Sequence, residues 1–330
     1  MNQTLSTVSD LAFEAALAGY IVAFVCYAVE LASRRGRDAT PAEQASADRR
    51  AARRAGGTDT LTRQDQTVGH IRSPARPGWG ERFGRAAVLI TVVAAVANVL
   101  SVITRGLAVW RLPLGNMYEF TSAICALAVV VWLIVLARTG ARSLGVVVML
   151  PVTILAGVAF SALYVPAAPV VPALNSYWKW IHVSTVAISS SVLMVSGAAS
   201  VLYLVRRRAE AKAEVGSGGG LADRLPSLAT LDRIAYRTAI IGFPLFTFAV
   251  IAGALWAEVA WGRYWGWDPK ETGAFITWIV YASYLHARST AGWRGARSAW
   301  ISVIGFATII FNLFFINMVI SGLHSYAGLN

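Results

Sequence analysis

The sequence predicts an all-α, polytopic integral membrane protein with about eight transmembrane helices and both termini outside. The 330-residue chain is 56% hydrophobic and only 14% charged, whereas about a quarter of the residues in a soluble domain are charged. The mean hydropathy is +0.57. The apolar residues gather in runs of about the 20 residues that a membrane-spanning helix needs. The basic residues gather between these runs.

Eight apolar runs are candidate transmembrane helices. They cover residues 11–33, 86–104, 118–137, 144–164, 181–205, 237–257, 273–290 and 299–320. The first run is interpreted as a permanent helix, because residues 1–10 contain no Lys or Arg and a signal peptide begins with a basic segment. We therefore expect an N-terminal transmembrane segment at 1–33 and a larger membrane domain at 86–330. No internal sequence repeat is visible.

The polar segments between the runs are expected to be loops. Segment 34–85 is rich in Ala, Arg, Asp, Thr and Gly and contains three prolines. Such a composition buries too little apolar surface to fold, so we expect a basic, disordered cytoplasmic loop. The run Gly-Ser-Gly-Gly-Gly at 216–220 predicts a flexible linker. The two cysteines lie in separate apolar runs and form no Cys-x-x-Cys motif, so no disulfide framework or thiol relay is visible.

The basic residues orient the predicted helices. With the N-terminus outside, the cytoplasmic segments contain 24 of the 29 Lys and Arg residues. These segments are 34–85, 138–143, 206–237 and 288–297. Cytoplasmic loops are enriched in these residues, so the asymmetry places both termini and segments 105–117, 165–180 and 258–272 outside. The cytoplasmic charge also suits the anionic lipids of the inner leaflet. No basic patch is interleaved with aromatic residues, so we expect no nucleic-acid binding.

The stretch from Trp256 to Glu271 lies between two apolar runs and is the strongest functional signal. Two glycines, Gly262 and Gly266, let its backbone bend and approach a ligand. A single tryptophan beside an apolar run usually anchors a helix in the membrane interface. A dense cluster with glycines and charges instead favours a platform for a large planar ligand. Its aromatic residues are Trp256, Trp261, Tyr264, Trp265 and Trp267.

The end of this stretch also has a local structural meaning. Asp268 is a favourable helix N-cap, and Pro269 suits the first helical position. Glu271 falls at the third helical position, from which its side chain can reach back to the cap. Asp268 is therefore either a ligand contact or only a helix cap. Three asparagines inside the apolar runs are candidates for hydrogen bonds between helices: Asn98, Asn312 and Asn317.

Three of the four histidines are candidate axial ligands of a haem iron. His182 begins the fifth run and His324 follows the eighth, so both are predicted on the outer side with the tryptophans. Imidazoles beside an aromatic platform suit haem ligation, although each could be an ordinary interfacial residue. His286 lies roughly 20 Å from the outer end of its run at 1.5 Å per residue. Ionisable residues within a span are usually functional, and the alternative is a snorkelling interfacial histidine.

Haem carries two propionates, which need cationic partners. The outer segments supply five candidates: Arg105, Arg111, Lys179, Arg263 and Lys270.

These residues resemble a known family. The segment from Trp261 to Glu271, Trp-Gly-Arg-Tyr-Trp-Gly-Trp-Asp-Pro-Lys-Glu, resembles the "WWD" signature of haem-handling membrane proteins. The flanking histidines and the Tyr-Leu-His-Ala-Arg sequence at 284–288 resemble the CcsA (also ResC) type of System II cytochrome c biogenesis proteins. Arg105 and segment 113–119 also fit. The resemblance covers about residues 86–330, and its combination of motifs is highly specific.

The resemblance implies cytochrome c maturation at the plasma membrane, with the active site on the extracytoplasmic face. Haem b, as cargo, would pass from a position near His286, completed by a histidine of a CcsB/ResB-type partner, to an outer site. There His182 and His324 would be the axial ligands, and the Cys-x-x-Cys-His segment of apocytochrome c would receive the haem. The chain would be a subunit of a holocytochrome c synthase (haem lyase) that positions haem and supplies no catalytic nucleophile. A thioredoxin-like protein would reduce the apocytochrome thiols.

The resemblance assigns the porphyrin contacts to the WWD stretch and the outer cations. The residues expected to bind haem, besides the three histidines, are Trp256, Trp261, Arg263, Tyr264, Trp265, Trp267, Asp268, Lys270, Arg105 and Arg111.

Two other functions compete with this one. A haem exporter or chaperone would pass haem on without a role in attachment, as System I relatives with similar WWD stretches do. A b-type electron-transfer cytochrome needs paired histidines at matching depths, and only one clear intramembrane histidine is visible.

Overall fold

The computed structural model describes residues 2–33, 78–168, 176–213, 224–316 and 320. Within these residues the chain forms eight α-helices and a terminal π-helical turn, and the described part contains no strand. The prediction of an all-α membrane protein is confirmed. The elements are α1 (Gln3–Ser33), α3 (Trp79–Val109), α4 (Met117–Thr139), α5 (Leu144–Ala162), α6 (Tyr177–Ala213), α7 (Leu228–Trp261), α8 (Pro269–Ser289), α9 (Ala296–Ile310) and η3 (Phe311–Phe315).

Seven helices are long and apolar enough to cross a membrane, and α8 is the exception among the described helices. Its 21 residues would span about 31 Å, so length is not the cause. Its sequence mixes Thr, Ser, Tyr, Trp and His with the apolar residues. The predicted run at 273–290 is therefore helical, but it is less hydrophobic than the other seven.

The helices extend beyond the apolar runs. α3 begins at Trp79, so residues 79–85 are helical, although the sequence predicted loop up to residue 85. An ion pair of 2.6 Å between Arg85 and Glu81, one turn apart, lies on this extension. Hydropathy detects only the part of a helix that suits hydrocarbon, and polar turns can continue it into water. The rest of the predicted loop and the 216–220 linker lie outside the described residues.

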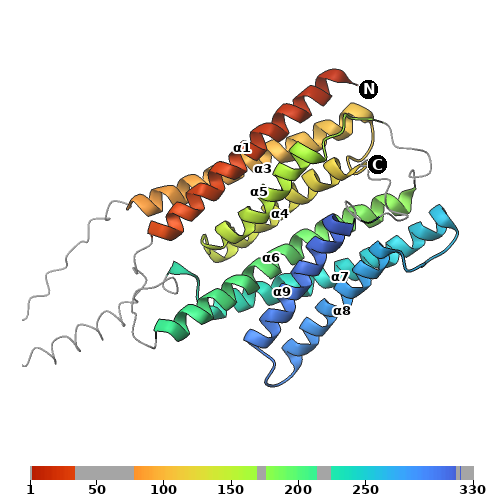
Figure 1. Cartoon of the computed structure of the whole chain (residues 1–330). Coiled ribbons are helices and arrows are strands. Elements are labelled where there is room, and N and C mark those ends of the chain that lie inside the picture. The colour runs from red at the N-terminus through yellow and green to blue at the C-terminus, as the bar shows by residue number, and fades with distance from the viewer. Residues whose placement is uncertain (1, 34–77, 169–175, 214–223, 317–319, 321–330) are drawn as a thin grey trace, which may run out of the picture.

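The helices form two groups of four with the same packing pattern (Figure 1). In the first group α1 packs along α3, and in the second α6 packs along α7. Likewise α5 contacts α1 and α4, as α9 contacts α6 and α8. The architecture therefore repeats, although no repeat is visible in the sequence. Helix packing needs only faces of suitable shape and polarity, and many different sequences provide these.

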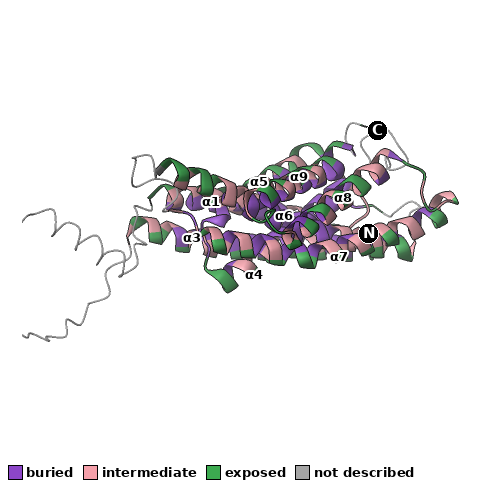
Figure 2. Ribbon diagram, turned by 90° about the horizontal axis from the view of Figure 1, so that it is seen from below, coloured by how far each residue is buried: buried purple, intermediate pink, exposed green. Residues whose placement is uncertain are grey.

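Close contacts between small residues hold α1 against α3. Gly19 of α1 lies so near Ala94 of α3 that an added Cβ would be 2.7 Å from the alanine Cβ. Small residues allow such approach in membrane helices. Asn98 donates a hydrogen bond to the Tyr20 hydroxyl (3.1 Å) and accepts one from Ser122 (2.9 Å), which joins α3 to α1 and α4 as predicted. Buried residues follow the middle of the bundle in Figure 2, and exposed ones lie on its outside.

The topology gathers several loops at one end of the bundle. The start of α1, the α3–α4 loop, the start of α6 and the α7–α8 loop lie together, on the right of Figure 1. We call this the tryptophan end, because the tryptophan-rich stretch covers the last turns of α7, the α7–α8 loop and the start of α8. His182 lies at this end, in the second turn of α6, whereas His286 lies near the opposite end of α8.

Candidate functional site

A cavity of about 140 Å³ opens at the tryptophan end, between the two groups of helices. The α3–α4 loop and the start of α4 form one wall, and α6, α7, α8 and η3 form the others. Six of the predicted site residues line the cavity: His182, Trp256, Trp261, Tyr264, Trp265 and Lys270. Six others that the structure describes do not belong to its lining, and they are Arg105, Arg111, Arg263, Trp267, Asp268 and His286. His324 lies outside the described residues.

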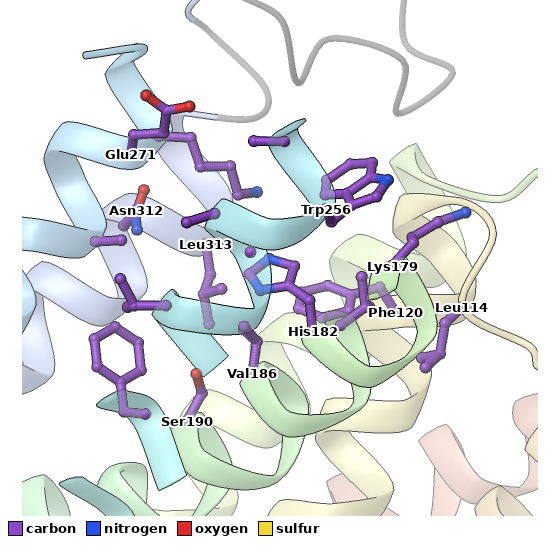
Figure 3. A pocket seen from close by; sticks show the side chains of 18 of the residues that line it. Leu114, Phe120, Lys179, His182, Val186, Ser190, Trp256, Glu271, Asn312 and Leu313 are labelled. Carbon is purple, nitrogen blue, oxygen red and sulfur yellow. The ribbon is translucent and has the colours of Figure 1, made fainter. Parts of the chain in front are cut away.

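His182 is held by α7 and directed into the cavity (Figure 3). Its Nδ1 atom lies 2.7 Å from the Ala249 carbonyl oxygen. A carbonyl oxygen can only accept a hydrogen bond, so Nδ1 carries the proton, and in the neutral ring the lone pair belongs to Nε2. Histidines that bind metals usually have this arrangement, in which one ring N–H donates to a carbonyl or carboxylate.

Gly253 makes room for the His182 ring. A Cβ at this position would lie 2.7 Å from the ring Cε1 and 2.8 Å from Nδ1, which is too close for any side chain. The imidazole therefore rests against the backbone of α7. Sequence reasoning missed Gly253, because a single glycine in an apolar helix usually serves only helix packing.

Tryptophans form the wall beside His182. Trp256 is only 2% exposed and stacks on the imidazole, with the two ring centroids 6.0 Å apart and the planes 23° apart. Trp261 packs against Trp256 at 5.2 Å. Trp267 is 65% exposed and packs edge-on against Trp265 at 5.7 Å. The predicted aromatic platform thus divides into a wall that lines the cavity and an exposed part at the surface.

Glu271 holds the α7–α8 loop, which we call the tryptophan loop, in place. One carboxylate oxygen accepts hydrogen bonds from the backbone N–H groups of Gly266 (2.7 Å) and Asp268 (3.2 Å), and the other lies 3.4 Å from the Arg263 guanidinium. The predicted capping box of Asp268 and Glu271 is confirmed. Trp267 takes a left-handed conformation (φ 57°), which is unusual for a bulky residue and often marks a functional site.

An equivalent Arg–Glu pair holds the α3–α4 loop. Glu119 lies eight residues after Arg111 and pairs with it at 2.7 Å, just as Glu271 lies eight residues after Arg263. Glu119 also accepts a hydrogen bond from the Gly115 N–H at 2.7 Å, and it follows the N-cap Asn116 as Glu271 follows its own cap. Each arginine follows a left-handed helix-ending residue. The eight-residue Arg–Glu spacing, which both loops share, is the sequence signal that could have revealed both ion pairs.

The structure places Arg105 and Arg111 in ion pairs. Arg105 is 2% exposed and contacts Asp10 (3.2 Å), Glu119 (3.3 Å) and the Val165 carbonyl. Arg111 binds Glu119 through two nitrogens. Both arginines stabilise the α3–α4 loop beside the cavity, and their assignment as haem contacts stays a prediction.

Asn312 joins η3 to the first turn of α8. With its amide oriented to satisfy both groups, it donates to the Lys270 carbonyl (3.3 Å) and accepts from the Ala274 N–H (3.0 Å). The predicted role of Asn312 between helices is confirmed, whereas Asn317 lies outside the described residues. The π-helical turn widens α9 beside the cavity, and such turns are frequent at functional sites.

Lys270 brings a cation to the cavity from the first turn of α8, outside the apolar run 273–290. Burial lowers the pKa of its ammonium to about 7, and the Asp268 carboxylate partly raises it again. An anionic group bound in the cavity would favour the charged form of this lysine.

His286 lies far from the cavity along α8, and its side chain is exposed on the surface of the bundle. Near it, Arg288 donates from its two terminal guanidinium nitrogens to the Asp232 carboxylate (2.5 and 2.8 Å), which ties this end of α8 to α7. The structure therefore separates His286 from His182, as the helical rise predicted.

Residues 114–324 match the family model "Cytochrome C assembly protein". A "Cytochrome c biogenesis protein CcsA" of Guillardia theta is 37% identical over 263 residues, which cover 73% of this chain and 85% of the relative. The protein of the same name in Porphyra purpurea is 34% identical over 75% of this chain and 88% of its own length.

One solved structure has a similar fold. It is "Cytochrome c Heme Lyase CcmF", with a TM-score of 0.62 and 16% sequence identity. The similarity covers 95% of this chain and 47% of that structure, so this chain spans about half the length of that protein.

Proposed function

The chain belongs to the cytochrome c assembly protein family and is a CcsA-type cytochrome c biogenesis protein, and from this premise we propose that its cavity presents haem to apocytochrome c. The cargo is haem b, held at the tryptophan end. The protein positions this haem while the thiols of a Cys-x-x-Cys-His segment add across its vinyl groups. Each S–H adds to one C=C bond, so the attachment needs no net oxidant.

One observation carries the proposal: the side chain of His182. Its Nδ1–H donates to the Ala249 carbonyl, so a neutral ring has its lone pair on Nε2 and can ligate iron. The same ring lines the cavity and stacks on Trp256. An imidazole ligand, tryptophan walls and nearby cations are the groups that a flat, apolar, dianionic molecule requires.

The second axial ligand of this position is proposed to be His324. It follows α9 and η3, and η3 lines the cavity through Leu313 and Asn312. Segment 317–330 is thus connected to the cavity wall by only a few residues of chain.

His286 is proposed to bind haem at an earlier step, together with a histidine of a CcsB/ResB-type partner. Its exposure on the surface of α8 supports this role, because a partner helix can reach it there. The excess of Lys and Arg in the opposite loops supports placing the tryptophan end outside the plasma membrane. A thioredoxin-like protein would keep the apocytochrome thiols reduced.

The function is tested by producing the protein with its partner, a c-type apocytochrome and a thiol reductant in cells that lack other maturation proteins. Covalent haem on the cytochrome, measured by haem stain after denaturing electrophoresis, is the expected result. Haem in the membrane complex without covalent cytochrome would instead support the exporter alternative. A complex without haem in a pyridine haemochrome assay would refute both.

A further inference from the structure

We propose that Lys179 binds a carboxylate of the ligand held in the cavity. This inference rests on the proposed function, in which the ligand is haem and the carboxylate is a propionate. The outer segments contain five basic residues. Each of the three arginines among them forms an ion pair, whereas Lys179 forms none with the described residues.

Lys179 lies on the ligand side of α6. It precedes His182 by three residues, about one helical turn, and both side chains line the cavity (Figure 3). Its side chain lies beside the α3–α4 loop, whose residues Leu114 and Gly115 line the same cavity. A ligand coordinated by His182 would therefore have Lys179 within reach of its edge.

The ammonium of Lys179 is buried without an acceptor from any residue that the structure describes. The residue is only 2% exposed, and its Nζ has no hydrogen-bond partner within the described part of the chain. The Trp180 ring centroid lies 4.5 Å from Nζ and attracts the positive charge. The ring does not replace the hydrogen bonds that the ammonium would make with water. A buried charge without a partner is costly, so such lysines usually face a bound anion.

Glu119, at the start of α4, is a candidate counterion, but its acceptor sites are already used. One oxygen accepts from Arg105 (3.3 Å) and Arg111 (2.9 Å). The other accepts from Arg111 (2.7 Å) and the Gly115 N–H (2.7 Å). A carboxylate has about four lone-pair sites, so these four donors saturate it.

The charges of the side chains beside the α3–α4 loop do not balance. Arg105, Arg111 and Lys179 carry three positive charges, and Asp10 and Glu119 carry two negative ones. Arg263 is paired separately with Glu271. One carboxylate from the ligand would neutralise the remaining charge and accept the hydrogen bond that Lys179 lacks.

The test compares haem with haem dimethyl ester, in which both propionates are methylated, by absorbance titration of the full-length protein purified with its partner. The variants are Lys179→Met, Lys179→Arg, which keeps the charge, and Lys212→Met as a control. Lys212 lies at the far end of the same helix and is exposed. Expressing the result as the affinity ratio of haem to ester cancels differences in how the two pigments partition into detergent.

The wild type and Lys212→Met should bind haem about tenfold or more tightly than the ester, as expected for a charge-assisted hydrogen bond. Lys179→Met should lower this ratio severalfold, with Lys270 remaining as the other lysine of the cavity lining, and Lys179→Arg should retain most of the ratio. The ligand-free Lys179→Met protein should melt no lower than wild type, because an unneutralised buried charge is removed.

Two results would overturn the inference, and they are distinguishable. An unchanged ratio in Lys179→Met, with a lower melting temperature, would make Lys179 a structural counterion and leave haem binding intact. Failure of the wild type to bind either pigment would refute the proposed function itself.

Discussion

His182 of α6 and Ala249 of α7 are joined by a hydrogen bond of 2.7 Å between the imidazole Nδ1 and the carbonyl oxygen. This bond fixes both the tautomer and the direction of the ring, and it connects two helices whose residues lie 67 positions apart. A metal ligand held in this way loses little freedom on binding, because its orientation is set before the ligand arrives.

Replacing His182 by Ala should remove most of the haem that copurifies with the protein and leave the remainder easily oxidised. Added imidazole should restore part of the binding, because a small molecule can occupy the vacated position. Thr185→Ala, one turn further along α6, should bind haem like the wild type. A His182→Ala, His324→Ala double variant with full haem content and normal cytochrome maturation would contradict the proposed ligation.

Gly253→Ala should weaken haem binding, because its Cβ would displace the His182 ring. Overpacking typically lowers the free energy of unfolding by about 1–3 kcal/mol, and a displaced ring no longer meets the ligand at its wild-type position. Gly157→Ala in α5 is the matched control, since nothing lies within 4 Å of its added Cβ. Haem titration and thermal unfolding of both variants check this prediction. Equal haem affinity in the two variants would show that the ring position is not critical.

Glu271→Ala should loosen the tryptophan loop, because two backbone N–H groups and Arg263 lose their acceptor. Losing the partner of a buried donor costs about 1–3 kcal/mol. We expect a lower melting temperature and a shift of tryptophan fluorescence toward solvent-exposed values. The exposed Glu81, paired with Arg85 on α3, provides the control variant Glu81→Ala. Wild-type melting and fluorescence in Glu271→Ala would mean that the loop keeps its conformation without the contacts of the Glu271 carboxylate.

Thiol labelling tests which end of the bundle faces outside. Tyr264 is 58% exposed at the tryptophan end, and Trp293 is 45% exposed in the α8–α9 loop at the other end. The native cysteines, Cys26 and Cys125, are buried and should react little. In intact cells, a membrane-impermeant reagent should label Tyr264→Cys but not Trp293→Cys. The reverse pattern would invert the orientation and move the proposed site to the cytoplasm.

His286→Ala, produced with the partner subunit, should lower haem at both positions, since the outer position would no longer be supplied. His324→Ala should instead weaken only the outer coordination or trap haem upstream. Haem content and the ligation spectrum of each variant check this difference. Full outer haem and normal maturation in His286→Ala would leave His286 as an interfacial residue.

Local sequence patterns predicted the features that depend on near neighbours. The capping box of Asp268 and Glu271 spans four residues, and the propensities of those residues are sufficient to form it. The apolar runs likewise predicted the seven described helices that are long and apolar enough to cross a membrane, because the hydrocarbon core selects for composition over about 20 residues. Their ends were less well predicted, as the early start of α3 at Trp79 shows.

The sequence by itself determined that this protein is a helical membrane protein, and it predicted an aromatic, histidine-containing site, because composition and short motifs are local properties. The tertiary structure alone decided which of these residues meet. Gly253 receives the His182 ring from another helix. The acceptor sites of Glu119 are filled by Arg105, Arg111 and the Gly115 N–H, while Lys179 has no acceptor among the described residues. Charge and polarity can be read along the chain, but pairing depends on distances between helices that are far apart in sequence, and only their packing sets those distances.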